Sequence, residues 1–162
     1  MAEFTEEIDV TEEDKEVCSK PAISRDVKID ELVRLLNIFS KVANKRWPAK
    51  PEEVYVDKVV MAIRGCSSVI KARQQAAIEA GVVPGLMETI TGCHQTDRET
   101  MVRTSQCILG ICGKNDEATA AFKEAGAGAA YAAVVAAHEG KDSTTNDMAK
   151  CLEMFAEAEA EG

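Results

Sequence analysis

Apolar residues recur at three- and four-residue steps through most of the chain that follows residue 28. The first run, from Leu32 to Phe39, predicts an amphipathic helix over residues 29–43. Residues 44–51 contain two prolines, which rule out a continuous helix, so we expect them to form a connector. The apolar spacing resumes after this connector and predicts a second helix over residues 52–66.

The rest of the chain has the pattern of shorter helices separated by glycine and polar turns. Gly81 is expected to stop one helix in the left-handed conformation, and Gly126 ends a later one. Thr96 with Glu99 matches a capping box, and Asn115 is expected to cap the helix that follows it. The helices predicted in this way cover residues 71–80, 84–91, 97–112, 115–126, 127–139 and 144–158. We find no strand pattern, so the predicted fold class is all-α.

One short motif recurs in the chain. The sequence Glu-Ala-Gly that ends at Gly81 returns 45 positions later, ending at Gly126. Gly65 and Gly110, each inside an apolar run, have the same spacing. The order of short helix, glycine turn, helix, polar loop and longer helix occurs over residues 71–113 and again over 115–156, and a partial copy precedes them. Such a period indicates stacked structural units, because one unit cannot bury its apolar face alone.

The segment from Ala72 to Leu86, with the sequence ARQQAAIEAGVVPGL, resembles the first helix, glycine turn and second helix of an armadillo repeat. Residues 115–135 are similar to the same pattern, and the resemblance covers residues 29–156, about two and a half repeats. It implies a right-handed superhelix of stacked helical repeats. The third helix of each repeat would then line a concave groove that binds extended peptides or partner helices.

The importin-like members of that family carry a tryptophan on each third helix and an asparagine four residues later, which together clamp the ligand backbone. The matching pairs here are Met61 with Gly65, Gln106 with Gly110 and Lys150 with Met154. Because both residue types are missing from these positions, we do not expect binding of the nuclear-import type.

Charge divides the chain unevenly and sets the expected domain boundaries. The 162-residue chain has a formal net charge of −9, of which eight acids and two lysines in residues 1–20 account for −6. We therefore expect residues 1–27 to form an acidic flexible tail, residues 28–158 an armadillo-like domain, and residues 159–162 a short C-terminal tail. The nearly neutral remainder argues against binding of nucleic acid through phosphate neutralisation.

The six cysteines fit a reducing compartment better than a disulfide framework. Cys66, Cys107 and Cys151 lie within helical apolar runs, where a free thiol behaves as a small buried hydrophobe. The first twenty residues are acidic and do not resemble a signal peptide, and no apolar stretch has the length of a membrane span. A cytoplasmic protein is expected, with the nucleus and a cytoskeletal assembly as open alternatives.

Two sets of residues are candidates for binding a partner. Trp47 lies in the connector beside Lys45 and Arg46, and it either contacts a partner or folds back over the end of the stack. The same basic strip could dock the acidic tail. The second set would face the groove if the armadillo register applies, or else form an ordinary solvated helix face, and it consists of Lys58, Met61, Arg103, Gln106, Lys150 and Met154. A groove of basic and methionine side chains would suit an acidic amphipathic partner.

Metal and catalytic patterns are missing from the sequence. Cys93 and His94 are adjacent, so they cannot both face one ion, and His138 is isolated. We expect no cofactor and a non-catalytic adaptor or assembly component that binds one or more proteins. A co-chaperone similar to the armadillo proteins that release nucleotide from the seventy-kilodalton heat-shock chaperone is an alternative, as is an enzyme with an unrecognised site. Two and a half repeats leave both ends of a stack open, which also predicts self-association or residence in a larger complex.

Overall fold

The computed structural model of the chain describes residues 11–19, 23–24, 26–44, 54–138 and 146–161. All regular structure in these ranges is helical, which confirms the predicted all-α class. The helices are α1 (Glu12–Ser19), α2 (Ile29–Phe39), α3 (Tyr55–Ser67), α4 (Lys71–Glu79), α5 (Val82–Thr91), α6 (Arg98–Cys112), α7 (Asp116–Glu124), α8 (Ala127–Ala137) and α9 (Asn146–Glu161).

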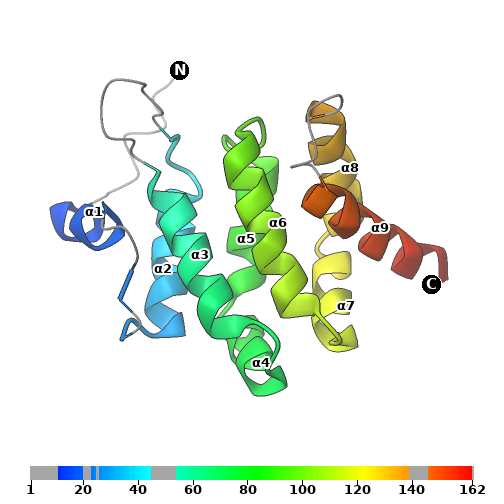
Figure 1. Ribbon diagram of the computed structural model, residues 1–162, viewed down its shortest axis with the longest axis horizontal. Helices are drawn as coiled ribbons and strands as arrows, with labels where there is room; N and C mark the ends of the chain where they lie inside the picture. Colours follow the sequence, from blue (N-terminus) through cyan, green and yellow to red (C-terminus); the bar gives the residue numbers. More distant parts are fainter. Residues whose placement is uncertain (1–10, 20–22, 25, 45–53, 139–145, 162) are drawn as a thin grey trace.

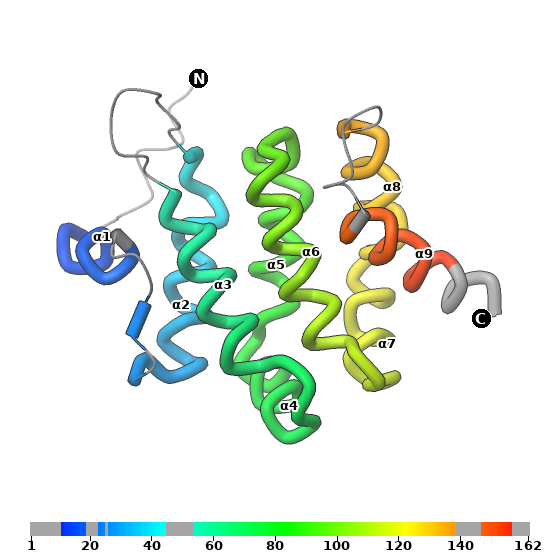
Figure 2. The backbone as a smooth tube through the Cα atoms, in the orientation of Figure 1, coloured from blue at the N-terminus to red at the C-terminus, as the bar shows by residue number. Residues whose placement is uncertain are grey.

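Most of the helices form two layers (Figure 1). Helices α3, α6 and α9 follow one another in the front layer, and α2, α5 and α8 follow one another behind them. The pairs α2–α3, α5–α6 and α8–α9 contact each other across the layers. Figure 2 shows the short helices α4 and α7 at the same end of the molecule. Each long helix therefore has neighbours both within its layer and in the other one.

The hydrophobic core lies between the two layers. Leu36 from α2, Val60 from α3 and Ile108 from α6 are fully buried, as are Leu86 and Tyr131 from α5 and α8. Burial of each large apolar side chain contributes roughly 1.5–3 kcal/mol. Because all these helices share this core, the stack folds around apolar contacts between successive helix pairs rather than around one central helix.

Backbone turns with positive φ recur with the same 45-residue spacing as the sequence motif. Gly81 and Gly126 have φ values of 92° and 93°, which confirms the predicted left-handed turns. Val69 and Lys114 have φ values of 73° and 52°. These four are the residues with positive φ in the described ranges, and they form two pairs, each separated by 45 positions. The unusual turns before α4 and α7, and those before α5 and α8, thus occupy matching places.

The N-terminus of α6 differs from the prediction. Asp97, rather than Thr96, is the capping residue, and its carboxylate accepts a hydrogen bond from the backbone N–H of Thr100. The other Asp97 oxygen accepts from Asn44 Nδ2 at 2.9 Å, a contact from the end of α2. This long-range bond adds a second partner for the carboxylate, which local spacing cannot reveal. Asn115 caps α7 as predicted, with its Oδ1 accepting from the N–H of Ala118 at 3.0 Å.

The described residues 11–19, 23–24 and 26–27 differ from the flexible tail expected over residues 1–27. Helix α1 packs against α3, and Cys18 and Ile23 are buried in the core. Thr11 begins this helix by accepting the N–H of Asp14, whose carboxylate pairs with Arg34 of α2 at 2.8 Å. The acidic composition suggested solvation, but two apolar contacts and one ion pair fix this segment to the stack. Residues 1–10 lie outside the described residues.

Candidate protein-binding surface

Helix α3 lies in the front layer, and Met61 on its exposed face and two residues of the following turn expose apolar side chains. Its buried face consists of residues such as Val56, Val60 and Ile63 at helical spacing. On the other side, Met61 is 45% exposed, and in the turn after the helix Val69 and Ile70 are 83% and 49% exposed. Within the described ranges these are the large hydrophobic residues with high exposure. Clustered exposed apolar residues are typical of surfaces that bind other molecules.

A shallow hollow of about 700 Å³ lies between α3 and α6. We call it the α3–α6 groove. It is lined by Met61, Arg64, Gly65, Ser68, Val69, Gln106, Leu109, Gly110 and Asp147. Most of the lining comes from α3 and α6, and Asp147 comes from the first turn of α9. The groove thus crosses the front layer and joins all three of its helices.

The turn that carries Val69 is strained and tightly held. Ile70 N donates to the carbonyl of Ser68 at 2.7 Å, which makes a three-residue γ-turn with Val69 at its centre. Left-handed φ in a β-branched residue costs on the order of 1–3 kcal/mol. The turn also contacts α6, where Val69 N donates to the carbonyl of Gly110 at 3.4 Å. Val69 is therefore held on the rim of the groove in a conformation that it would not adopt alone.

Gln74 supports this turn from inside the protein. Its side chain is 1% exposed and its Nε2 donates to the carbonyls of Gly110 and Gly113, at 2.9 and 3.0 Å. Its Oε1 accepts from Asn115 Nδ2 at 2.8 Å. These bonds link α4 to the end of α6 and the start of α7. Because every polar atom of the Gln74 amide has a partner, the wall of the groove is rigid at this end.

Polar side chains connect the three front helices across the groove floor. Arg64 Nη1 donates to Gln106 Oε1 at 3.5 Å, and Gln106 Nε2 donates to Asp147 Oδ2 at 3.0 Å. Gln106 therefore bridges α3 and α9 from α6. The Gln106 amide thus holds α3 and α9 beside α6. The guanidinium of Arg64 stays exposed at the surface.

A buried acid anchors the other end of α3 to α6. Asp57 is fully buried and accepts from Arg103 Nη1 at 2.8 Å and from Thr100 Oγ1 at 2.6 Å. A buried carboxylate needs such partners, because removal from water is costly without them. The guanidinium of Arg103 on α6 thus neutralises a buried carboxylate on α3 and holds these two helices of the front layer together.

The predicted site residues separate into five groups. Met61 and Gln106 meet in the α3–α6 groove, while Lys58 lines a second cavity together with Met61. Lys150 lines a separate hollow on α9. The remaining groove candidates face the protein itself, because Arg103 pairs with Asp57 and Met154 packs against the core. Lys45, Arg46 and Trp47 lie outside the described residues.

Only Met61 and Gln106 of the groove residues were predicted from the sequence as partner contacts, and Val69 and Gly110 are among those that were missed. Val69 follows the periodic part of α3, and its exposure depends on a turn held by α6. The available signal was the apolar pair formed by Val69 and Ile70, which stands outside the helical period immediately before Lys71.

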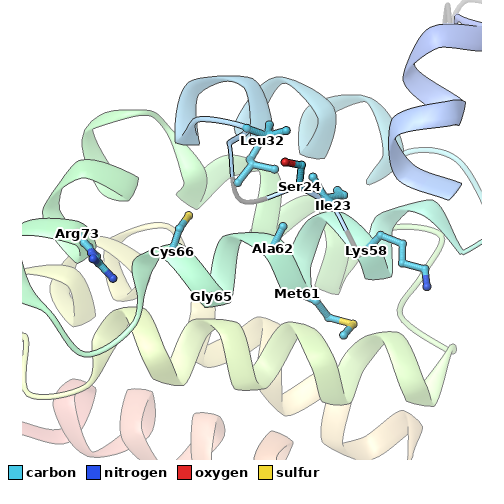
Figure 3. Close-up of a pocket in the computed structure, with 10 residues that line it drawn as sticks. Ile23, Ser24, Leu32, Lys58, Met61, Ala62, Gly65, Cys66 and Arg73 are labelled. Atoms are coloured by element: carbon cyan, nitrogen blue, oxygen red, sulfur yellow. The ribbon is translucent and has the colours of Figure 1, made fainter. Parts of the chain in front are cut away.

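The second cavity has a volume of about 730 Å³ and lies on the other side of α3 (Figure 3). Ile23, Ser24 and Val27 line one side, and the side chains of Leu32, Ala62 and Cys66 contribute an apolar lining. Arg73 lies at one end of this cavity in Figure 3. Gly65 and Met61 line both cavities, so the two hollows flank one turn of α3. We call the second one the edge cavity.

Four of the six thiols are buried, and both imidazole rings bond backbone carbonyls. Burial raises the pKa of the Cys18, Cys112 and Cys151 thiols to about 12, and it raises the pKa of Cys107 as well. The two histidine rings bond backbone carbonyls between the helices, with His94 Nε2 at 3.0 Å from Phe39 O and His138 Nε2 at 2.8 Å from Gln95 O. Since a carbonyl oxygen only accepts, each Nε2 donates. Within the described ranges no three His, Cys, Asp or Glu side chains gather as a metal site would require.

Comparisons of the chain with models of protein families, with curated proteins and with solved structures found no match. Every helix in the part of the chain that the structure describes is too short or too polar to span a lipid bilayer.

Proposed function

We propose that the chain is a non-catalytic adaptor or assembly component that binds other proteins through an armadillo-like helical surface. The observation that carries this proposal is the α3–α6 groove, where exposed Met61 and Val69 flank a hollow of about 700 Å³. Apolar surface costs free energy while it faces water, so a partner that covers it gains affinity.

The conformation of Val69 supports the same function. Strained backbone is retained at sites where the surrounding structure over-determines it, and such sites are often functional. The Val69 turn is held by α6 through Gly110 and by Gln74 through the end of α6. A rigid rim lowers the entropy that a partner must lose on binding.

The repeated turns support an armadillo-like arrangement. The positive-φ pairs occur at the spacing of the Glu-Ala-Gly motif, and the helices form two layers in which each pair contacts the next. In the armadillo register the front layer would consist of third helices, and the α3–α6 groove would lie on the concave face.

Affinity purification of the full chain from its source cells, followed by mass spectrometry, tests the proposal. We expect a partner in fixed stoichiometry with the chain. Val69→Glu places a charge at the groove rim and should reduce recovery of that partner at least about tenfold. Ala132→Glu, on an exposed position of α8, is the matched control and should retain the partner. Equal recovery with both variants, or no stoichiometric partner, would contradict the proposal.

A further inference from the structure

Gly65 and Gly110 occupy matching positions 45 residues apart, but only one of them is covered. A Cβ atom added to Gly110 would collide with the side chain of Ser68, in the turn that follows α3. A Cβ atom added to Gly65 would meet no atom within 4 Å in the described structure. Glycine at 110 is therefore favoured by the close approach of the Ser68 side chain, whereas nothing in the described fold favours it at 65.

Glycine within a helix is unfavourable compared with alanine, because the unfolded chain loses more conformational freedom. Gly65 lies near the last turn of α3 and is exposed. At Gly110 the missing side chain leaves room for the side chain of Ser68, and the carbonyl of Gly110 accepts from Val69 N of the same turn. A segment that packed against Gly65 in the same way would have to come from outside the described fold.

The edge cavity provides the space for such a segment. It is lined by Ile23, Ser24 and Val27 together with Gly65, on the side of α3 that corresponds to the covered side of α6. Figure 3 shows Ala62 and Cys66 pointing toward Leu32, while the Met61 side chain points the other way. The interior of the cavity is thus apolar, and its volume of about 730 Å³ accommodates more than one side chain.

Charge defines the chemistry of the occupant. The described residues that line the edge cavity include Lys58 and Arg73 and contain no Asp or Glu. Arg73 is exposed and makes no side-chain hydrogen bond or ion pair with another residue in the described ranges. The guanidinium is a fixed fork of donors that binds carboxylates in two places at once.

We propose that the edge cavity binds an acidic segment of a partner protein. The segment's backbone passes over Gly65, an apolar side chain packs on Ala62 and Cys66, and a carboxylate pairs with Arg73. This inference rests on the proposed function as a protein-binding module, but it uses the opposite side of α3 from the α3–α6 groove. The two surfaces share Met61 and Gly65, and they are told apart by Val69 in the α3–α6 groove and Arg73 in the edge cavity.

Selection of short random peptides displayed on phage, with the full chain as target, tests the inference. Selected sequences should combine Asp or Glu with large apolar residues. A synthetic copy of one selected peptide is then titrated by fluorescence anisotropy. Gly65→Leu fills the space above the helix and Arg73→Glu reverses the charge, so each should weaken binding by at least about tenfold.

Matched variants separate this site from the rest of the surface. Ala133→Leu places a leucine side chain on an exposed face of α8, and Lys41→Glu makes the same charge change at an exposed position just after α2. Both should bind the peptide as the natural chain does, and thermal melting confirms that all four variants fold. Selection of basic peptides, or no enrichment at all, would overturn the inference. Binding that depends on Val69 but not on Gly65 or Arg73 would also overturn it, while leaving the proposed function intact.

Discussion

At the scale of single residues, the two helix glycines show how identical chemistry acquires different roles. Ser68, in the turn after α3, packs against Gly110, whereas Gly65 faces an open cavity. Both glycines nevertheless occupy the same place in similar apolar runs. Their shared spacing was visible in the sequence. Which of them is covered depends on the turn of the preceding helix pair, and only the fold places that turn.

Alanine substitution should separate the two glycines. Gly65→Ala removes the unfavourable backbone entropy without a clash and should raise the free energy of unfolding by about 0.5–1 kcal/mol. Gly110→Ala forces Ser68 away and should lower it by about 1–3 kcal/mol. Urea denaturation followed by circular dichroism measures both changes. Shifts in the same direction would contradict the geometry.

At the scale of elements, helix ends depend on both local and distant partners. The Asn115 cap was predictable because a side-chain oxygen at that position satisfies free backbone N–H groups. The second bond of its amide, to Gln74 on α4, connects residues 41 positions apart and has no local signature. The cap of α6 was predicted one residue early because Asp97 is also held by Asn44.

Substitution of Asn115 should test the two roles of its amide. Asn115→Ala removes the cap and leaves the buried Gln74 oxygen without its donor, so the free energy of unfolding should fall by about 2–3 kcal/mol. Asn115→Ser retains a capping oxygen and should lose roughly half as much. Chemical denaturation gives both values. A serine variant as unstable as the alanine variant would show that capping contributes little here.

Helix α1 should respond to acid through its ion pair with α2. The hydrogen bond from Arg34 lowers the pKa of Asp14 below its ordinary value. The folded state then binds a proton less readily than the unfolded state, so this pair stabilises the fold above the unfolded pKa of about 3.9. That contribution is lost as the pH falls through the lower pKa of the folded state.

Denaturation of Asp14→Asn across acidic pH measures this effect. The variant should be less stable than the natural chain at neutral pH, and the difference should shrink as the pH falls below about 4. Asp26→Asn, at an exposed acid between α1 and α2, is the control and should give a smaller change. A stability difference for Asp14→Asn that stays constant across this range would contradict the assignment.

At the scale of the whole molecule, the acidic N-terminal region is partly integrated into the stack. Cys18 and Ile23 belong to the core, and α1 packs on α3. Composition predicted a solvated tail because acids dominate this region. The pairing of Asp14 with Arg34 and the burial of two apolar residues outweigh that tendency.

Truncation should show this integration directly. Deletion of residues 1–20 removes α1 and exposes part of α3, so the free energy of unfolding should fall by about 1–3 kcal/mol. Deletion of residues 1–10 leaves α1 in place and should change the free energy of unfolding less. Thermal melting compares the two forms at equal concentration. Identical melting temperatures would mean that α1 contributes little to the stability of the stack.

The sequence by itself determined the helices and the glycine turns, because apolar spacing and the backbone freedom of Gly81 and Gly126 act over a few residues. It also indicated that Met61 and Gln106 share a surface, through the 45-residue spacing. The tertiary structure decided which polar groups became structural, since Arg103 is committed to a buried Asp57 on another helix. It also decided that Val69 stands on a rim and that Gly65 is open. Those outcomes arise from the approach of helix pairs that are distant in the chain, and local periodicity carries no information on that approach.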